Sequence, residues 1–363
     1  MTMPAMLPGT TDRARVLVAM SGGVDSSVAA ALLVEQGYDV IGATMKLFCY
    51  GDDVPDRPCC SLDSIQDAAS VSSKLGIPHY VLNFEDRFGE DVIANFVSEY
   101  SRGRTPIPCV RCNSFTKFRD LVAHADALGC DYVATGHYVV ARNGELHRGA
   151  DTGKDQTYFM WGIDASMVPR MLTPVGELSK VETRAMARQL GLRTADKPES
   201  VEICFVPDGN YVGVLERHLG PEDPSLTPGP ILDRDGREIG RHEGYARYTI
   251  GQRRGLPGGF NEPRYVVGIE PERRAIVIGT AADLFAHEAE LQEVNWLAEP
   301  LQVGATCHAQ VRYRARPLPA RVVDISADGR LRLQLAEPAR AVTPGQSGVL
   351  YKGTRLIGGG ILH

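Results

Sequence analysis

Cysteine thiols are the side chains of this chain whose types and spacing could do the most chemistry. They form three groups: Cys109-Val-Arg-Cys112, Cys204 within Ile203-Cys-Phe205, and the adjacent pair Cys59-Cys60. The thiolate is the reactive form, and nearby cations or a helix N-terminus lower the pKa of a thiol from about 8.5. Cys112 lies close to Arg111 and Lys117 and ahead of an expected helix, so we expect it to be the most activated of these thiols.

A metal site is the main alternative use of these thiols. Structural zinc needs four ligands, usually from two spaced cysteine pairs. Cys59 and Cys60 are adjacent rather than spaced, which disfavours zinc. An iron–sulfur cluster held by Cys109, Cys112 and another thiol remains an open alternative. The other cysteines are typical of buried, small apolar side chains: Cys49, Cys130 and Cys307.

A second chemical feature is the segment Met20-Ser-Gly-Gly-Val-Asp-Ser-Ser27, which directly follows the apolar run Val16-Leu-Val-Ala19. The pattern predicts a buried strand, a glycine turn and a helix start, whose N–H groups and positive dipole end bind anions. We expect Gly22 and Gly23 to adopt backbone conformations closed to other residues. The segment lacks the Gly-Lys-Ser/Thr ending of a Walker motif. It resembles instead the pyrophosphate loop (PP-loop) of ATP pyrophosphatases, which split ATP into AMP and pyrophosphate to activate an oxygen.

The first two hundred residues alternate apolar strands with helical stretches. This alternation predicts an α/β, Rossmann-like domain with a parallel sheet and helices on both faces, whose ligands bind beyond the carboxyl ends of the strands. The expected strands are Val16–Met20, Val40–Met45, Tyr80–Phe84 and Tyr132–Thr135. The expected helices are Ser26–Gln36, Ser64–Leu75, Arg87–Tyr100, Ser114–Leu128 and Lys180–Leu190.

The pattern changes after about Pro207. Pro221–Pro230 is rich in proline and glycine and is typical of a connector. A hairpin is expected from Val266–Ile269 and Ala275–Ile278, and short strands within residues 307–350 fit a small closed barrel. We therefore expect the second half to be all-β. The predicted domains are a PP-loop domain (residues 1–207), a small β-rich central domain (208–282) and a C-terminal β-barrel (283–363).

The composition of the 363 residues is that of a soluble globular protein, with 43% hydrophobic and 23% charged residues. No apolar run approaches the ~20 residues of a membrane span. Met1–Arg15 lacks the apolar core of a signal peptide, so we expect a cytoplasmic protein with no membrane association. Eight cysteines are too few and too scattered for a disulfide scaffold.

The net charge of −6 argues against indiscriminate binding of nucleic acid. Two stretches nevertheless contain no acid, residues 101–119 and 301–323. Local basic surfaces on an acidic protein suit a specific polyanion held at a few places. Solvated arginines on strand faces are an equally open interpretation. The basic side chains of the two stretches include Arg102, Arg104, Arg111, Lys117, Arg119, Arg312, Arg314, Arg316 and Arg321.

Taken together, these motifs resemble the bacterial tRNA-specific 2-thiouridylases, the MnmA family. The resemblance covers nearly the whole chain and is specific, because other PP-loop enzymes share only the first motif. It rests on Met20-Ser-Gly-Gly-Val-Asp-Ser-Ser27, Gly103-Arg-Thr-Pro106, Cys112-Asn113, Ala134-Thr-Gly-His-Tyr138, Lys154-Asp-Gln-Thr-Tyr-Phe159, Ile203-Cys-Phe205, Tyr248-Thr-Ile-Gly-Gln252, Arg312-Tyr-Arg314 and Pro344-Gly-Gln346.

The resemblance implies ATP-dependent 2-thiolation of the wobble uridine (U34) in tRNAs for Lys, Glu and Gln. It implies an adenine nucleotide alpha hydrolase-like N-terminal domain that binds ATP and is catalytic, followed by two β domains, of which the C-terminal barrel would contact tRNA. ATP would adenylate the carbonyl oxygen on carbon 2, and a sulfur carried as a persulfide would then displace AMP, yielding s2U34, AMP and pyrophosphate. Cys204 would carry the persulfide and Cys112 would attack it, leaving a Cys112–Cys204 disulfide. Many family members have Asp, a proposed acid/base, where this chain has Cys109. Either another group transfers that proton or Cys109 does so as a thiol, and Cys109 would also be a candidate for a competing resolving thiol.

The same resemblance implies ligand-binding roles. Asp25 would contact Mg²⁺, Met45 would contact adenine, and Gly136 would let the nucleotide approach. The bland alternatives are a helix N-cap for Asp25, a core side chain for Met45 and an ordinary turn for Gly136. ATP phosphates would be held by Ala19, Met20, Ser21, Gly22, Gly23, Val24, Asp25 and Ser26. tRNA would be contacted by His137, Lys154, Asp155, Gln156, Arg312, Tyr313 and Gln346.

Partners and competing functions complete the prediction. The sulfur would come from a cysteine desulfurase, directly or through carrier proteins, and we expect a monomer. One alternative is another PP-loop enzyme, an amidotransferase or ligase, which would not need Cys112 or Cys204. A second is a non-catalytic tRNA-binding protein, which would release no pyrophosphate. A third is an iron–sulfur-dependent tRNA thiolase, which would be brown when purified without oxygen.

Overall fold

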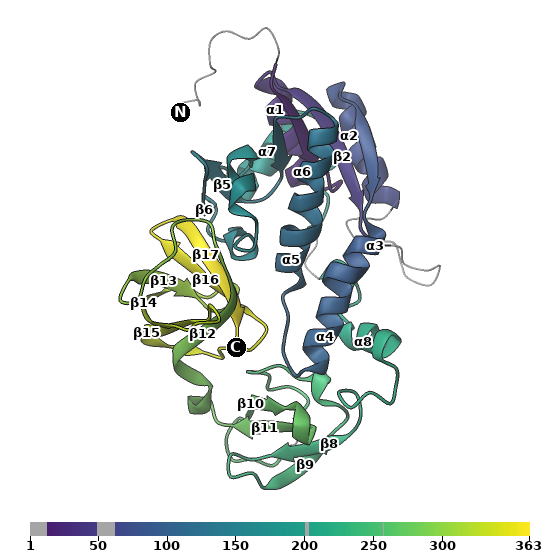
Figure 1. Cartoon of the computed structure of the whole chain (residues 1–363). Coiled ribbons are helices and arrows are strands. Elements are labelled where there is room, and N and C mark those ends of the chain that lie inside the picture. Colours follow the sequence, from purple (N-terminus) through teal and green to yellow (C-terminus); the bar gives the residue numbers. More distant parts are fainter. Residues whose placement is uncertain (1–12, 49–61, 200–202, 257) are drawn as a thin grey trace.

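The N-terminal half folds around a five-stranded parallel sheet (Figure 1). The computed structural model describes residues 13–48, 62–199, 203–256 and 258–363, so Cys49, Cys59 and Cys60 lie outside the described residues. The four predicted strands are confirmed, and a short fifth strand follows them at the edge. The strand order is β3 (His79–Asn83), β2 (Asp39–Lys46), β1 (Arg15–Ala19), β4 (Tyr132–Thr135) and β7 (Met171–Leu172).

Both faces of this sheet are covered by helices. Successive residues of a strand point to opposite faces. In β1, Val16 and Val18 pack in a cluster with α1 (Val24–Glu35), α2 (Leu62–Leu75) and α7 (Lys180–Gln189). Leu17 and Ala19 pack in the other cluster, with residues of α6 (Phe118–Ala127). The predicted helix–sheet–helix layering is therefore confirmed.

Two further helical segments run from the sheet toward the rest of the molecule (Figure 1). Each contains one π-helical turn: α3 (Glu85–Phe88), η1 (Gly89–Ile93) and α4 (Ala94–Ser101) form one, and α5 (Pro108–Arg111), η2 (Cys112–Lys117) and α6 form the other. The second segment begins at Pro108, six residues before the expected start at Ser114, because proline is favoured in the first turn of a helix. Cys112 consequently lies one turn inside the helix, and the expectation that it precedes the helix is wrong.

The central region begins with a helix that the sequence analysis missed. Helix α8 (Tyr211–Leu219) is capped by the Asn210 side chain and packs on α4, where the Tyr100 and Tyr211 rings stack 4.7 Å apart. The expectation of an all-β second half is wrong at this point. The central sheet follows in the order β10 (Tyr265–Glu270), β11 (Ala275–Gly279), β8 (Gly229–Leu232) and β9 (Glu238–His242), with the expected hairpin between β10 and β11.

Six strands form the predicted C-terminal barrel, which closes where β12 pairs with β17. The two closing strands were not among the expected elements. Short 3₁₀ turns complete the secondary structure: η3 (Thr157–Phe159), η4 (Ala165–Arg170), η5 (Tyr245–Arg247), η6 (Pro271–Arg273) and η7 (Ala282–Leu284). The barrel strands are β12 (Phe285–Trp296), β13 (Thr306–Gln310), β14 (Leu318–Ile325), β15 (Leu331–Arg340), β16 (Ser347–Lys352) and β17 (Arg355–Leu362).

A hairpin of the N-terminal half extends the barrel sheet. Strands β5 (Val139–Arg142) and β6 (Glu145–Arg148) join its edge through the pair Arg355 and His147. Arg148 donates to Gln310 Oε1 at 2.8 Å and lies 4.2 Å from the centre of the Tyr351 ring.

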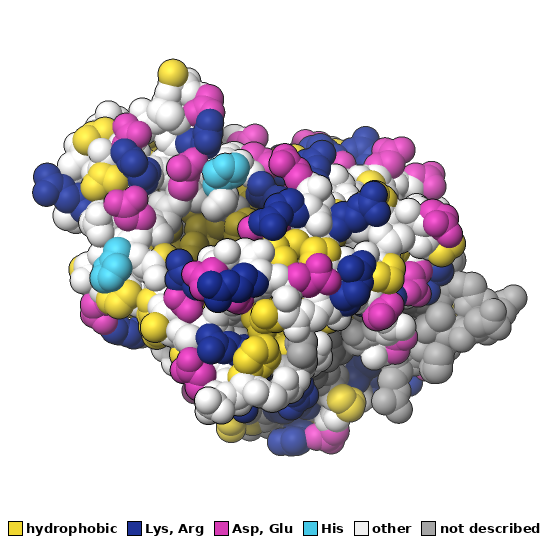
Figure 2. Space-filling view, turned by 90° about the horizontal axis from the view of Figure 1, so that it is seen from below, with side chains coloured by type: hydrophobic (Ala, Val, Ile, Leu, Met, Phe, Trp, Pro, Cys, Tyr) yellow, Lys and Arg dark blue, Asp and Glu magenta, His cyan; other side chains and the backbone are white. Residues whose placement is uncertain are grey.

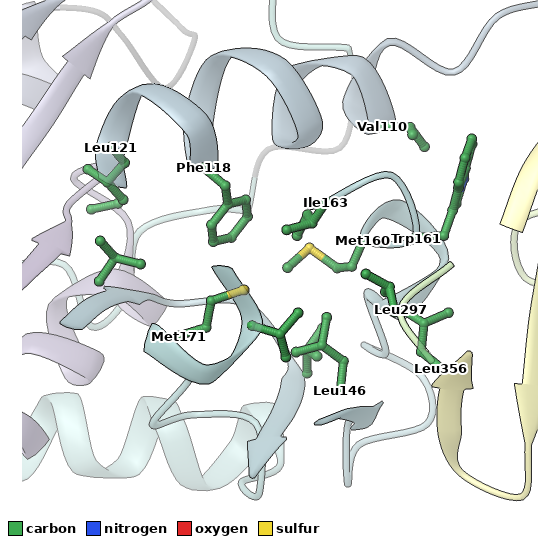
Figure 3. Packing of buried hydrophobic residues seen from close by; sticks show 14 of the residues in the cluster. Val110, Phe118, Leu121, Leu146, Met160, Trp161, Ile163, Met171, Leu297 and Leu356 are labelled. Carbon is green, nitrogen blue, oxygen red and sulfur yellow. The ribbon is translucent and has the colours of Figure 1, made fainter. Parts of the chain in front are cut away.

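One hydrophobic cluster is shared by the sheet domain and the barrel (Figure 3). Phe118 and Leu121 of α6 point toward Met171, and Val110 lies near Trp161 in the same layer. Leu297 and Leu356 of the barrel region complete this layer, so the two domains are packed against each other. Within the described ranges, no helix is long and apolar enough to cross a membrane.

Candidate active site

A cavity of about 320 Å³ lies at the carboxyl ends of the parallel strands. It is where an α/β sheet is expected to bind its ligand. Most predicted nucleotide-site residues, all three predicted site cysteines and two of the predicted tRNA contacts line it: Ala19, Met20, Ser21, Asp25, Ser26, Met45, Cys109, Cys112, Gly136, His137, Gln156 and Cys204. The predicted residues that do not line it are Gly22, Gly23, Val24, Lys154, Asp155, Arg312, Tyr313 and Gln346.

The PP-loop is held by hydroxyl groups of its own serines. Ser26 Oγ accepts a hydrogen bond from Ser21 N at 3.1 Å and lies 3.2 Å from Gly23 O, to which it donates. Gly22 has φ +70°, and a β-carbon there would lie 2.1 Å from Ser64 O, so only glycine fits. Gly23 has φ −94°, an ordinary extended conformation, so the expectation of an unusual backbone there is wrong.

Gly136 allows a close approach between two loops of the site. A β-carbon on Gly136 would lie 2.5 Å from Ser26 N and 2.7 Å from Asp25 C. The Thr135–Gly136 turn therefore packs directly on the backbone at the start of α1, whose N–H groups form the predicted anion seat. Gly136 is thus required by the packing of the site and is more than an ordinary turn residue.

The Asp25 carboxylate is an ion-pair partner. Gly23 is the N-cap of α1, so the N-cap interpretation of Asp25 is excluded. Lys180 Nζ lies 2.7 Å from Asp25 Oδ1 and 2.8 Å from Oδ2, and Tyr138 donates its hydroxyl to Oδ1 at 2.9 Å. An ammonium shared by both oxygens repels a divalent cation at those same oxygens. In this arrangement Asp25 does not fit the role of a direct Mg²⁺ ligand that the sequence predicted.

The three cavity thiols differ in exposure. Cys112 is 5% exposed, Cys204 is half-buried and Cys109 is exposed. The segment around Cys204 is anchored by Phe205, whose ring lies 5.8 Å from Phe88 and 5.1 Å from Phe96. Among the described residues, no group of three or more His, Cys, Asp or Glu side chains is arranged to hold a metal ion.

His137 is an uncharged member of the cavity wall. Burial and, secondarily, the Lys117 cation lower the pKa of His137 to about 3. Its Nδ1 lies 2.9 Å from Thr135 Oγ1. The imidazole is therefore neutral near pH 7 and is suited to hydrogen bonding rather than to attracting a phosphate.

The three side chains of the predicted Lys154-Asp155-Gln156 motif make contacts with different parts of the protein. Lys154 Nζ donates to Glu199 Oε2 at 2.6 Å. Asp155 turns inward, where its Oδ1 accepts from Thr157 Oγ1 at 2.8 Å. Gln156 Oε1 accepts from Tyr138 N at 2.8 Å, and Gln156 lines the cavity. Lys154 therefore pairs with Glu199 and not with the adjacent Asp155.

The remaining predicted RNA contacts lie outside the cavity. Arg312 and Tyr313 follow β13 and are exposed. The Tyr313 ring lies 4.6 Å from Phe159, which follows the Lys154-Asp155-Gln156 motif. Gln346 donates to Thr105 O at 2.9 Å and so joins the barrel to the segment before Cys109.

Seen from below, the molecule is hollowed, with hydrophobic side chains at the floor of the hollow and charged side chains around it (Figure 2). A hollow of about 620 Å³ on the barrel, lined by Cys307, His308, Arg321 and Lys352 among others, contains none of the predicted catalytic, nucleotide-binding or tRNA-binding residues.

Sequence analysis missed several residues of the site. Lys180 is the most important, since its ammonium neutralises Asp25. The capping box of Ser179 and Glu182 could have placed Lys180 at a helix start, but nothing local indicates that it faces the PP-loop. Nothing in the sequence near the apolar residues that line the cavity indicates that they face it: Leu47, Phe88, Val92, Phe118 and Leu121.

Three family models match the chain. Residues 14–208 match a model described as a tRNA methyl transferase HUP domain, residues 213–280 a tRNA methyl transferase PRC-barrel domain, and residues 286–362 an aminomethyltransferase beta-barrel domain.

Two curated relatives carry a different name. The chain is 48% identical over 359 residues to tRNA-specific 2-thiouridylase MnmA of Rhodospirillum centenum, covering 95% of this chain and 91% of that protein. It is 46% identical over 354 residues to the protein of the same name from Rickettsia typhi, covering 96% and 98%. Among solved structures, NMN synthetase from Francisella tularensis aligns with a TM-score of 0.35 and 17% identity over 58% of this chain and 78% of that chain, a likeness too low to carry a conclusion.

Proposed function

The chain belongs to the tRNA-specific 2-thiouridylase family and is an ATP-using sulfurtransferase that 2-thiolates tRNA uridine, and we propose that its two half-reactions, adenylation of the uridine and delivery of sulfur to it, both take place in the 320 Å³ cavity. The observation that carries this proposal is that Cys112 and Cys204 line the same cavity as the PP-loop residues Ser21, Asp25 and Ser26. A nucleotide held by the PP-loop and a sulfur held by a thiol would then meet at one base.

In the first half-reaction, ATP lies with its phosphates at the start of α1 and its adenine near Met45. The oxygen on carbon 2 of U34, in tRNAs for Lys, Glu and Gln, attacks the α-phosphorus. The bond to the bridging oxygen breaks and pyrophosphate leaves. AMP bound to the base is a far better leaving group than the original carbonyl oxygen. The backbone N–H groups at the start of α1 bind the departing charge.

In the second half-reaction, sulfur arrives as a persulfide on Cys204. The Cys112 thiolate attacks the Cys204 sulfur, the S–S bond of the persulfide breaks, and hydrosulfide is released beside the base. Hydrosulfide attacks carbon 2 and AMP leaves, which yields 2-thiouridine. The two protein sulfurs are left as a disulfide, whose two electrons must be returned by an external thiol reductant. Burial of Cys112 supports its role as the attacking thiolate, because the sulfur that attacks the persulfide is then shielded from bulk water.

tRNA contacts are proposed at several points. His137 and Gln156 would hydrogen-bond the flipped base within the cavity, consistent with a neutral imidazole. Lys154, Arg312 and Tyr313 would hold the anticodon stem-loop, and splayed bases suit the Tyr313 ring. Asp155 and Gln346 would act indirectly, since their side chains contact protein. Cys109, exposed at the cavity, is proposed as the acid/base or resolving thiol.

A cysteine desulfurase would supply the sulfur, directly or through carriers, to a cytoplasmic monomer. The ends of the three matched ranges support the division of the chain at residues 208 and 283.

The test combines ATP, magnesium, unmodified tRNA, cysteine and a cysteine desulfurase, followed by nucleoside analysis. We expect 2-thiouridine and pyrophosphate from the unaltered enzyme, and loss of 2-thiouridine in Cys112→Ser and Cys204→Ser. Cys307→Ser, a buried barrel cysteine, is the matched control and should retain product. Formation of 2-thiouridine by both variants would refute the proposed transfer of sulfur by Cys204 and Cys112. If the purified protein is brown and its activity is proportional to its iron content, the reaction depends on an iron–sulfur cluster and not on the two thiols alone.

A further inference from the structure

Four charged side chains form a ladder of alternating sign between the PP-loop and the proposed RNA-contact loop. Asp25 pairs with Lys180 at 2.7 Å, Lys180 with Glu199 at 3.1 Å, and Glu199 with Lys154 at 2.6 Å. Glu199 Oε1 faces Lys180 and Oε2 faces Lys154, so one carboxylate bridges two lysines. Partial desolvation opposes its ionisation, but hydrogen bonds from Lys154 and Lys180 lower the pKa of Glu199.

The donors of Lys180 are all in use. A lysine ammonium has three protons, and Lys180 Nζ has three carboxylate oxygens within 3.1 Å: both of Asp25 and one of Glu199. Lys180 is 9% exposed and therefore cannot turn its ammonium into water. A phosphate that binds Lys180 must displace one of these oxygens, and the contact with Glu199 is the longest.

Lys154 is in a related position at the other end of the ladder. Its ammonium donates to Glu199 at 2.6 Å, and its side chain is 38% exposed. An RNA phosphate that binds Lys154 would meet the Glu199 carboxylate on the same ammonium. Two anions in contact with one cation repel each other, so the phosphate drives Glu199 away.

We propose that Lys180 is a nucleotide-phosphate ligand of this enzyme and that Glu199 is an internal anion which the phosphates of ATP and RNA displace from the two lysines. This inference rests on the proposed function, because it takes Lys154 as an RNA contact. The first ligand to bind bears the cost of displacing Glu199, and the second ligand then meets a lysine that has already been released. ATP and RNA therefore strengthen each other's binding, by the same factor in either order.

The test measures binding without catalysis. The dissociation constant of an ATP analogue with a methylene group between the α- and β-phosphorus is measured with and without saturating, unmodified anticodon stem-loop RNA. For the unaltered enzyme we expect the RNA to tighten analogue binding about 5-fold or more, the lower end of usual coupling factors. In Glu199→Gln, which keeps the size of the side chain, each ligand alone should bind several-fold more tightly and the coupling should fall below about 2-fold.

Two further variants keep the test decisive. Glu199→Asp keeps the charge but shortens the side chain, so it cannot bridge both lysines and should also lose coupling. Asp196→Asn removes a carboxylate from the same segment, one that pairs only with Arg188 among the ion pairs of the described residues, and should keep the coupling of the unaltered enzyme. Unaltered coupling in Glu199→Gln, equal loss in Asp196→Asn, or no coupling in the unaltered enzyme would each overturn the inference. None of these measurements requires Cys112 or Cys204, so absence of 2-thiouridine would refute the proposed function alone.

Discussion

Gly136 offers a substitution whose effect can be worked out from one distance. The β-carbon of Gly136→Ala would lie 2.5 Å from Ser26 N, whereas ordinary contact begins at 3.4 Å, so the two backbones must separate by about 0.9 Å. Both are rigid, since one follows β4 and the other starts α1. A misplacement of about 1 Å at a reacting centre costs on the order of 100-fold, or about 2.7 kcal/mol. We therefore expect kcat/KM for ATP to fall about 100-fold.

The assay is pyrophosphate release in the presence of tRNA, with melting temperature recorded for each variant. Gly268→Ala is the matched control, because its β-carbon would lie 3.5 Å from Val277, an ordinary contact in the central sheet. That control should keep kcat/KM within about 2-fold. If Gly136→Ala folds normally and keeps kcat/KM within about 3-fold of the unaltered enzyme, the proposed position of the phosphates against the start of α1 is refuted.

Three other predictions test the site and the domain contact. Because the pKa of His137 is lowered to about 3, only the unfolded chain binds a proton at this residue between pH 3 and 6.5. Lowering the pH from 7.5 to 5 should therefore reduce the free energy of unfolding, measured in urea, by about 2 kcal/mol more in the unaltered protein than in His137→Gln. Equal reductions in the two proteins would contradict this. Tyr313→Ala should weaken anticodon stem-loop binding about 5- to 150-fold through lost stacking, and Tyr313→Phe should not; equal effects in a filter-binding assay would argue against stacking. Arg148→Met should lower the free energy of unfolding by about 2 kcal/mol, because it removes the contacts with Gln310 and Tyr351. Arg142→Met, exposed on the same hairpin, should change it by less than about 0.5 kcal/mol, and similar losses in both variants would contradict the argument.

The PP-loop and the strands around it were predictable because their signals are local. A buried strand such as β1 is an apolar run followed by glycine and serine, and its sequence alone marks both the strand and the turn. Gly22 is required by its positive φ, which the turn position indicates. Gly23 has an ordinary φ, so composition alone misjudged it.

Strands that depend on contacts with residues far away in the sequence were not predicted. Strand β17 contains Gly358–Gly360, a run that is typical of a loop. These glycines are instead required by packing, since a β-carbon on Gly359 would lie 2.7 Å from Trp161 and one on Gly358 would lie 2.5 Å from Asn295 O. The β5–β6 hairpin joins the barrel through the pairing of His147 with Arg355. The sequence around His147 does not indicate this pairing, because Arg355 lies far away in the chain.

Helix α8 could have been found. Asn210 is a strong N-cap residue, Val214 and Leu215 are buried on one face, and Gly220 ends the helix at φ +80°. The β-rich pattern that follows these residues led to the wrong prediction that the second half contains only strands. Lys180 and Glu199 belong to a different class, because their roles arise only when two segments far apart in sequence meet at Asp25.

In the proposed mechanism, the persulfide sulfur on Cys204 reaches the base only after Cys112 attacks Cys204 and releases it as hydrosulfide. The most direct measurement loads Cys204 with ³⁵S-labelled persulfide, adds ATP and unmodified tRNA, and follows the label through one turnover. The unaltered enzyme is expected to transfer the label to 2-thiouridine, while Cys112→Ser keeps it on Cys204 and still releases pyrophosphate. Transfer by Cys112→Ser at the rate of the unaltered enzyme would show that Cys112 is not needed to release the sulfur.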